Sequence, residues 1–293
     1  MNGVSRKPKD GWQQQNCANF MFIPTRKFAI CLYLFIAITN LALAGVLFKY
    51  SNEIVQYRKE YFCDADSCEI QLNIKEKIPS PVYLYYEIEN YYQNHRIYAK
   101  SRSSKQLAGK DFSAGELIEC EPVVKVKDLD WDEKVLKKSG FKENQVANPC
   151  GLIAKSYFLD SYEFKNGPKI KTEDIAWPSD LEGKFKNQDE WEKVQWTDVE
   201  DEHFIVWMRI AATKDFIKLW GIIDEDLEGK YTLKIEEKMD FSEFDGKKYI
   251  LLSNANVFGG KNTVLYYALF ISGGLACIWT LVFIFYPLVI KRH

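Results

Sequence analysis

Two long apolar segments without a charged residue constrain this chain more than any other feature. They run from Phe28 to Phe48 and from Val264 to Ile290, 21 and 27 residues that contain no Asp, Glu, Lys, Arg or His. A helix of 21 residues is about 31 Å long, which is close to the hydrocarbon thickness of a bilayer. The longer segment can cross a bilayer with some tilt. We therefore expect two transmembrane helices.

A cleaved signal peptide is the alternative interpretation of the first segment. Ala42-Leu43-Ala44 provides small residues of the kind that signal peptidase recognises. The apolar run is nevertheless longer than the ~7–15 residues that are usual in a signal peptide, and a polar leader of 27 residues precedes it. These lengths favour a helix that remains in the protein.

Basic residues beside the two segments predict the orientation in the membrane. The 27 residues before the first segment carry five basic residues and one acid, and Lys291-Arg292-His293 follows the second. Because loops rich in Lys and Arg stay in the cytoplasm, both ends are expected there. The sequence therefore predicts a cytoplasmic tail (1–27), a first transmembrane helix (28–48), a lumenal or extracellular ectodomain (49–263), a second transmembrane helix (264–290) and a cytoplasmic tail (291–293).

Composition and motifs exclude several classes of function. The net charge of −2 argues against a general basic face for nucleic acid. The sequence contains no HExxH, GxSxG, Walker or GxGxxG motif, so we expect no catalytic residues, no cofactor and no enzymatic activity. The acidic stretch from Asp198 to His203 lacks the spacing of an EF-hand. We interpret it as a solvated acidic face before a buried strand, and expect no metal.

Four of the seven cysteines lie in the predicted ectodomain: Cys63, Cys68, Cys120 and Cys150. An even number in an oxidising compartment predicts disulfides, and four cysteines permit three connectivities. Proximity along the chain favours Cys63–Cys68 with Cys120–Cys150. Free thiols are the main alternative, and a zinc site formed by Cys63 and Cys68 is less favoured in this compartment.

The ectodomain sequence is typical of an antiparallel β structure with short helical insertions. Apolar residues alternate in Val82–Ile88 and in Tyr231–Ile235, as in half-buried strands. Phe204–Ile210 and Tyr249–Leu252 are continuous apolar runs and are predicted as more fully buried strands. Long connections separate these segments, so a βαβ array is not expected.

Polar and small residues mark three places where contacts are expected. Asn40 is the strongly polar side chain of the first span, and Ser272-Gly273-Gly274 allows close approach of another backbone in the second. These residues fit contact with helices of another protein, or simply contact between the two spans. Asn94-His95-Arg96 fits either an anion or headgroup contact, or a structural role in which His95 and Arg96 donate hydrogen bonds to carbonyls of neighbouring loops.

Several strings along the chain are similar to those of one known family. The chain resembles the cell division control protein fifty family, the accessory (beta) subunits of the type IV P-type ATPases that move phospholipids. The matching strings, in family order, are Pro81–Tyr86, Tyr91–Tyr98, Gln106–Gly109, Cys120-Glu121-Pro122, Pro149–Ala154, Ile175-Ala176-Trp177, Phe204–Arg209, Gly229–Leu233, Phe244–Lys248 and Gly259–Asn262.

The resemblance implies a fold, a partner and a location. The fold would be two transmembrane helices with a large, mainly β, sandwich-like ectodomain, in which the Cys-Glu-Pro and Pro-Cys-Gly cysteines, Cys120 and Cys150, pair. The protein would bind one catalytic flippase chain as a 1:1 heterodimer, in contact with membrane lipids. Like a chaperone, it would support that chain's folding, its exit from the endoplasmic reticulum and its activity. The complex would reside in the endoplasmic reticulum, the Golgi or endosomes, or the plasma membrane.

Polar, basic and small residues are the candidates for contacts with the partner that the resemblance implies. They are Arg26, Lys27, Asn40, Asn94, His95, Arg96, Gly273 and Gly274. A departure from the family is the long charged insertion between Cys120 and Cys150. The alternatives to an accessory subunit are a two-helix trimeric ligand-gated channel and an adhesion-type receptor ectodomain. Four ectodomain cysteines and uncharged spans count against the channel.

Overall fold

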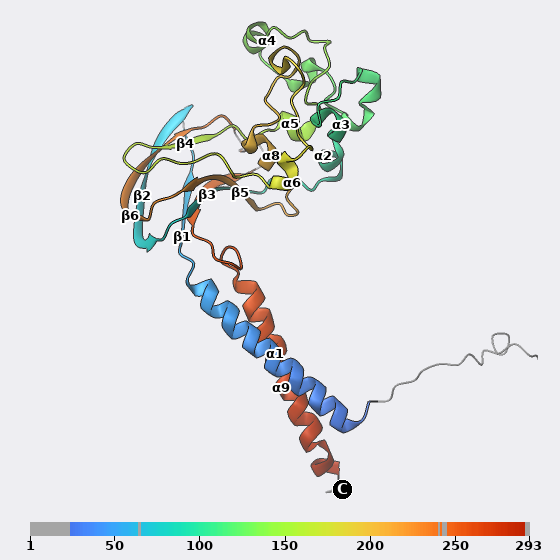
Figure 1. The fold of residues 1–293 in the computed structure, drawn as a ribbon, viewed down its shortest axis with the longest axis vertical. Helices are drawn as coiled ribbons and strands as arrows, with labels where there is room; N and C mark the ends of the chain where they lie inside the picture. The colour runs from blue at the N-terminus through green and yellow to red at the C-terminus, as the bar shows by residue number, and fades with distance from the viewer. Residues whose placement is uncertain (1–23, 64–65, 240, 242–244, 291–293) are drawn as a thin grey trace, which may run out of the picture. The chain divides into compact units, whose positions relative to one another are not determined.

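The computed structural model describes residues 24–63, 66–239, 241 and 245–290, with side chains up to residue 286, and it divides into two compact units. One unit comprises Met1–Ser51 with Asn262–His293, and the other comprises Asn52–Lys261. Figure 1 shows two long helices in the first unit, and strands with short helices in the second. The outer parts of the expected cytoplasmic tails, 1–23 and 291–293, lie outside the described residues.

The first unit consists of helices α1 (Arg26–Asn52) and α9 (Thr263–Ile290), which contain the two predicted spans. Both are long and apolar enough to cross a membrane, yet only 11% and 17% of their most apolar stretches are buried within the protein. A core helix of a soluble protein would be mostly buried. The large apolar surface that remains requires apolar surroundings, and a bilayer provides them.

The two helices pack along an antiparallel seam. Ring pairs join Tyr33 to Phe283 and Phe48 to Tyr266, with centroids 5.6 and 5.3 Å apart. The seam repeats every three or four residues, the spacing of a coiled coil. It consists of buried and half-buried residues: Tyr33, Ala37, Asn40, Ala44, Leu47 and Ser51 of α1, with Tyr266, Leu269, Gly273, Ala276, Thr280 and Phe283 of α9. Small residues on both helices let the two backbones approach closely.

The second unit contains two antiparallel sheets. The larger has the order β1 (Gln56–Tyr61), β7 (Lys247–Ser253), β3 (Val82–Glu89) and β5 (Phe216–Ile223). The smaller has the order β2 (Ser67–Ile78), β6 (Leu227–Glu236) and β4 (Ser161–Phe164). The predicted strands in Val82–Ile88, Tyr231–Ile235 and Tyr249–Leu252 are confirmed as parts of β3, β6 and β7.

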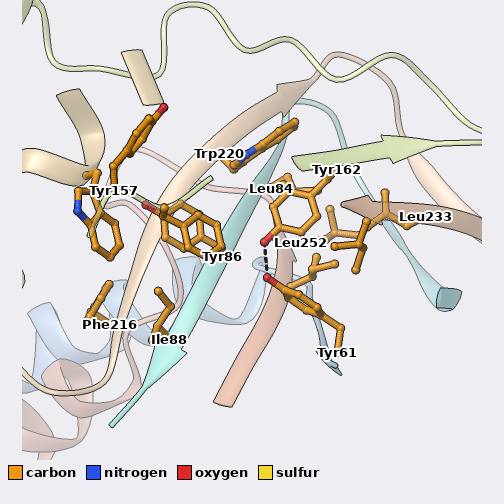
Figure 2. Packing of buried hydrophobic residues seen from close by; sticks show 14 of the residues in the cluster. Tyr61, Leu84, Tyr86, Ile88, Tyr157, Tyr162, Phe216, Trp220, Leu233 and Leu252 are labelled. Carbon is orange, nitrogen blue, oxygen red and sulfur yellow. Dashed lines mark hydrogen bonds between the residues drawn. The ribbon is translucent and has the colours of Figure 1, made fainter. Parts of the chain in front are cut away.

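One apolar core takes side chains from both sheets, as expected for a sandwich. Leu84 and Leu252 of the larger sheet and Leu233 of the smaller sheet are fully buried in it (Figure 2). Tyr86 stacks on Phe158 with ring centroids 4.1 Å apart. The fold class expected from the sequence, two apolar helices with a mainly antiparallel β ectodomain, is confirmed.

Short helices cover one end of the sheets, and some of them enclose a second core. They are α2 (Arg96–Lys100), α3 (Ser104–Leu107), η1 (Ala114–Glu116), η2 (Ile118–Cys120), η3 (Val126–Leu129), α4 (Glu133–Ser139), α5 (Leu152–Lys155), α6 (Pro178–Leu181), α7 (Trp191–Val194) and α8 (Glu202–Met208). The second core surrounds Cys120 and Cys150 and includes Val126 and Leu129. The charged insertion between the two cysteines is therefore folded around its own buried residues.

The predicted strand at Phe204–Ile210 is wrong, because most of this segment forms helix α8. Its N-terminus is capped by Asp201, whose side chain accepts a hydrogen bond from the backbone N–H of His203 at 3.1 Å. Phe204, Ile205 and Trp207 are all buried, so the helix is apolar around most of its circumference. In a short, continuous apolar run, periodicity alone cannot distinguish a buried helix from a buried strand.

Candidate partner-binding surfaces

Asn40 and Gly273 serve the contact between the two helices. The Asn40 side-chain amide donates a hydrogen bond to the Ser272 hydroxyl at 2.9 Å. A Cβ atom added to Gly273 would lie 2.8 Å from Cγ of Leu41, so glycine is needed for this close approach. The alternative that the two spans pack against each other therefore accounts for both residues.

Gly274 lies on a different face of α9 from Gly273. A Cβ atom added there would meet no atom within 4 Å. Large apolar side chains flank it along the helix: Ile271 is 64% exposed and Ile278 is 56% exposed. This face, Ile271–Gly274–Ile278, has a small residue between two large ones, and the small residue lets another helix pack closely.

Arg26 and Lys27 are exposed at the start of α1.

Asn94 belongs to a loop that is tied to the chain before β5. Its side-chain amide donates to the carbonyl oxygen of Ala212 at 2.8 Å. The backbone N–H of Asn90 donates to Asp215 at 2.9 Å in the same pair of loops. The hydrogen bond to a neighbouring carbonyl is therefore made by Asn94, whereas the structural alternative expected such bonds from His95 and Arg96.

His95 and Arg96 instead form part of an exposed surface. Their side chains are exposed and make no hydrogen bond or ion pair with the residues that the structure describes. The adjacent Tyr92 and Ile97 are 53% and 59% exposed. We call these four residues the Tyr92–Ile97 surface. Aromatic, apolar and basic side chains on one exposed surface are typical of a protein interface.

The acidic stretch before α8 is not the solvated face that the sequence suggested. The Glu202 carboxylate accepts hydrogen bonds from the backbone N–H groups of Asp174, Ile175 and Ala176 at 2.7–3.0 Å. Asp201 caps α8 and accepts a hydrogen bond from the Tyr157 hydroxyl at 2.6 Å. These carboxylates hold loops in place, and the described residues contain no group of acidic, His and Cys side chains suited to a metal.

The four cysteines of the ectodomain pair as proximity along the chain favoured. Cys63 pairs with Cys68 and Cys120 pairs with Cys150, with Cα atoms 5.3 and 5.7 Å apart. The second lies in the core of the helical insertion. There the Ser101 hydroxyl donates to the Cys120 carbonyl oxygen at 2.8 Å. The zinc alternative for Cys63 and Cys68 does not apply.

A buried lysine that the sequence did not reveal connects the two sheets. The ammonium group of Lys248, on β7, lies 2.6 Å from carboxylate oxygens of both Asp160 and Glu237. Asp160 also accepts hydrogen bonds from the Tyr61 hydroxyl at 3.0 Å and from two backbone N–H groups. Tyr61 and Tyr162 share a hydrogen bond between their hydroxyls (Figure 2), and burial raises the pKa of both.

A second buried lysine caps the C-terminal end of α8. Lys218 of β5 donates hydrogen bonds to the carbonyl oxygens of Val206, Trp207 and Arg209 at 3.1, 2.6 and 2.6 Å. Its ammonium group supplies the hydrogen-bond donors that the last carbonyl groups of a helix lack. Burial lowers its pKa from the ordinary 10.5 to about 7.

Comparison with known proteins assigns the chain to a family. The model of the LEM3 (ligand-effect modulator 3) family / CDC50 family matches residues 13–293. The chain belongs to the CDC50 family. The resemblance seen in the sequence strings is thereby confirmed.

Individual relatives in the CDC50 family come from plants, animals and fungi. "ALA-interacting subunit 3" of Arabidopsis thaliana is 34% identical over 244 residues, which cover 77% of this chain and 65% of the relative. "Cell cycle control protein 50A" of Mus musculus is 34% identical, covering 68% and 62%. "Phospholipid-transporting ATPase accessory subunit CDC50" of Chaetomium thermophilum is 28% identical, covering 74% and 59%. The chain thus spans somewhat less than two thirds of these relatives' lengths.

Replacing Lys248 by methionine should lower the free energy of unfolding of this CDC50 protein by about 3–5 kcal/mol, because Asp160 and Glu237 would remain buried without a cation. The neighbouring Lys247 is the matched control, since its side chain is 55% exposed and its contact with Glu60 is long at 3.6 Å. Lys247→Met should cost less than about 1 kcal/mol. Thermal unfolding of both variants would measure the difference, and equal losses would contradict the role given to Lys248.

The lowered pKa of Lys218 should make stability rise with pH. Between pH 7 and 9 the unfolded chain keeps the proton that the folded protein, with a pKa of about 7, gives up. This difference should add about 2 kcal/mol to the unfolding free energy across that interval. Denaturant titrations at the two pH values would show the rise in the parent protein and not in Lys218→Met. The same pH dependence in both proteins would contradict the assignment.

Proposed function

We propose that this chain is a non-catalytic accessory (beta) subunit of a phospholipid-translocating P-type ATPase, needed for the folding, endoplasmic reticulum exit and activity of the catalytic chain. The observation that carries the proposal is the match of the CDC50 family to residues 13–293. Support comes from the fungal relative, whose name describes a phospholipid-transporting ATPase accessory subunit. ATP hydrolysis and lipid movement would belong to the partner.

The proposed arrangement keeps both ends of the chain in the cytoplasm. Segments 28–48 and 264–290 would cross the membrane, 49–263 would form the lumenal or extracellular ectodomain, and 1–27 and 291–293 would form the cytoplasmic tails. The basic residues next to the two spans support this orientation. The complex would lie in the endoplasmic reticulum, in Golgi or endosomal membranes, or in the plasma membrane.

The physical basis of the role is attachment at several places at once. A folded unit held at both ends by single helices can contact a partner outside the bilayer and within it. Once one contact forms, the others form at high effective concentration, so individually weak contacts produce a stable 1:1 heterodimer. Membrane lipids would surround the helices where the partner does not.

Two surfaces are best suited to these contacts. Within the membrane, the Ile271–Gly274–Ile278 face is open, whereas Asn40 and Gly273 are engaged between α1 and α9. In the ectodomain, the Tyr92–Ile97 surface presents exposed apolar and basic side chains. Arg26 and Lys27 would contribute at the cytoplasmic end of α1.

The proposal is tested by purifying the tagged chain in mild detergent and identifying associated proteins by mass spectrometry. We expect one chain of P-type ATPase size in equal amount, whose lipid-stimulated ATP hydrolysis falls when this protein is removed. A self-associated trimer without such a chain would replace the proposal with the channel alternative. A monomer without an ATPase would favour the receptor alternative.

The Gly274 face can be tested separately by one substitution. Gly274→Leu should reduce co-purification of the catalytic chain several-fold, because a bulky side chain would hold a partner helix away from α9. Ala268→Leu is the control, since Ala268 is exposed about 120° around the same helix from Gly274. The Asn40–Ser272 hydrogen bond should persist in both variants. Unchanged recovery of the catalytic chain with Gly274→Leu would exclude this face as a contact.

A further inference from the structure

A cavity of about 630 Å³ opens in the ectodomain where α3, α6 and the end of α8 meet. Its apolar lining includes Leu107 and Phe185, and its charged lining consists of Arg102, Lys184, Arg209 and Asp180. The volume lies within the range of small-molecule sites, ~300–1,000 Å³.

The charges that line the cavity do not balance. Three basic side chains face one acid, a local charge of +2 in a chain whose net charge is −2. The Asp180 carboxylate uses one oxygen for Lys184, at 2.6 Å, and the other for Arg209, at 2.5 Å. The hydrogen bond from Arg209, with that from Lys184, lowers the pKa of Asp180, so this acid is ionised at neutral pH. One positive charge is neutralised and two are not.

The basic groups are held in place before any ligand arrives. Asp180 is itself 4% exposed, so it fixes Arg209 from within the fold. The Arg209 guanidinium also lies 5.3 Å from the ring centre of Trp177. Arg102 donates from one terminal nitrogen to the carbonyl oxygen of Met208 at 3.2 Å. Because a guanidinium has five N–H donors, both arginines keep donors available for a further acceptor.

A purely structural role does not account for this arrangement. Fixing α6 to the end of α8 requires only the Asp180–Arg209 pair. Arg102 and Lys184 add positive charge around the same cavity, so the positive charge there exceeds the single negative charge of Asp180. Both Lys184 and Arg209 remain accessible, with side chains 61% and 50% exposed.

We propose that this cavity binds an oxyanion of the phosphate class, with the arginine and lysine groups on the phosphate oxygens and the apolar lining against the rest of the ligand. Planar guanidinium groups match two oxygens of a phosphate at once. The phosphate could belong to a free phosphate or to the headgroup of a phospholipid. The site goes beyond the proposed subunit role, since it needs no partner protein.

The test is calorimetric titration of the full-length chain in a neutral detergent at constant ionic strength. Inorganic phosphate and dihexanoyl phosphatidic acid are the two probes. Saturable binding of both with equal affinity would identify a site for free phosphate. Clearly tighter binding of the short-chain lipid would identify a lipid headgroup with its apolar part on Leu107 and Phe185.

Charge-removing variants show whether the binding takes place in this cavity. Lys184→Gln and Arg102→Gln should each weaken binding about tenfold, the value of one charge-assisted hydrogen bond. Lys138→Gln removes the same charge from exposed α4, outside the cavity, and should leave the affinity unchanged. Failure of both probes to bind, or equal affinity in the cavity variants and the parent protein, would overturn the proposal. Because no catalytic chain is present, the result does not depend on the subunit assignment.

Discussion

The buried ammonium of Lys248 is the interaction on which the arrangement of the two sheets depends. It comes from β7 of the larger sheet, whereas its partners Asp160 and Glu237 precede β4 and follow β6 of the smaller one. Burying such charges is costly unless each is paired and hydrogen-bonded. Glu237 uses its other oxygen for the backbone N–H of Cys63, at 2.6 Å, so the network extends to the Cys63–Cys68 disulfide. Apolar packing is not directional, whereas this network requires the Lys248 ammonium to lie between the carboxylates of Asp160 and Glu237.

The helix pair follows a different physical rule from the sheets. Burial of apolar surface cannot drive two helices together in lipid, so close packing and hydrogen bonds must do so. Ala37, Ala44 and Gly273 allow the close approach, and the Asn40–Ser272 bond removes the cost of an unpaired amide in hydrocarbon. The polar and small residues of this seam are consequently engaged within the chain. The outer faces of both helices remain available to lipid and to other helices.

The sequence predicted the helices and three strands because their patterns are local. Strand β5 was missed because Lys218 occupies an inward position between Phe216 and Trp220, and a lysine there breaks the apolar alternation. Strand β2 does show alternation at Ile70, Leu72 and Ile74, which could have identified it. The Lys248 network and the cavity around Asp180 could not be predicted, since their members lie far apart in the chain and meet only after folding. Polarity alone placed Asn40, Asn94 and Arg96 together as candidates, although their surroundings differ.

Intramolecular contacts separate those candidates into two groups. Asn40, Asn94 and Gly273 each have a partner within their own unit, and moving them toward another protein would leave buried or bonded groups unsatisfied. Gly274, His95 and Arg96 make no such contacts among the described residues. Binding to a partner would therefore break no intramolecular contact at these positions. The proposed accessory role needs both groups. The first would keep the helix pair and the ectodomain in defined shapes before assembly, which would reduce the entropy that binding must overcome. The second would then form the contacts with the partner.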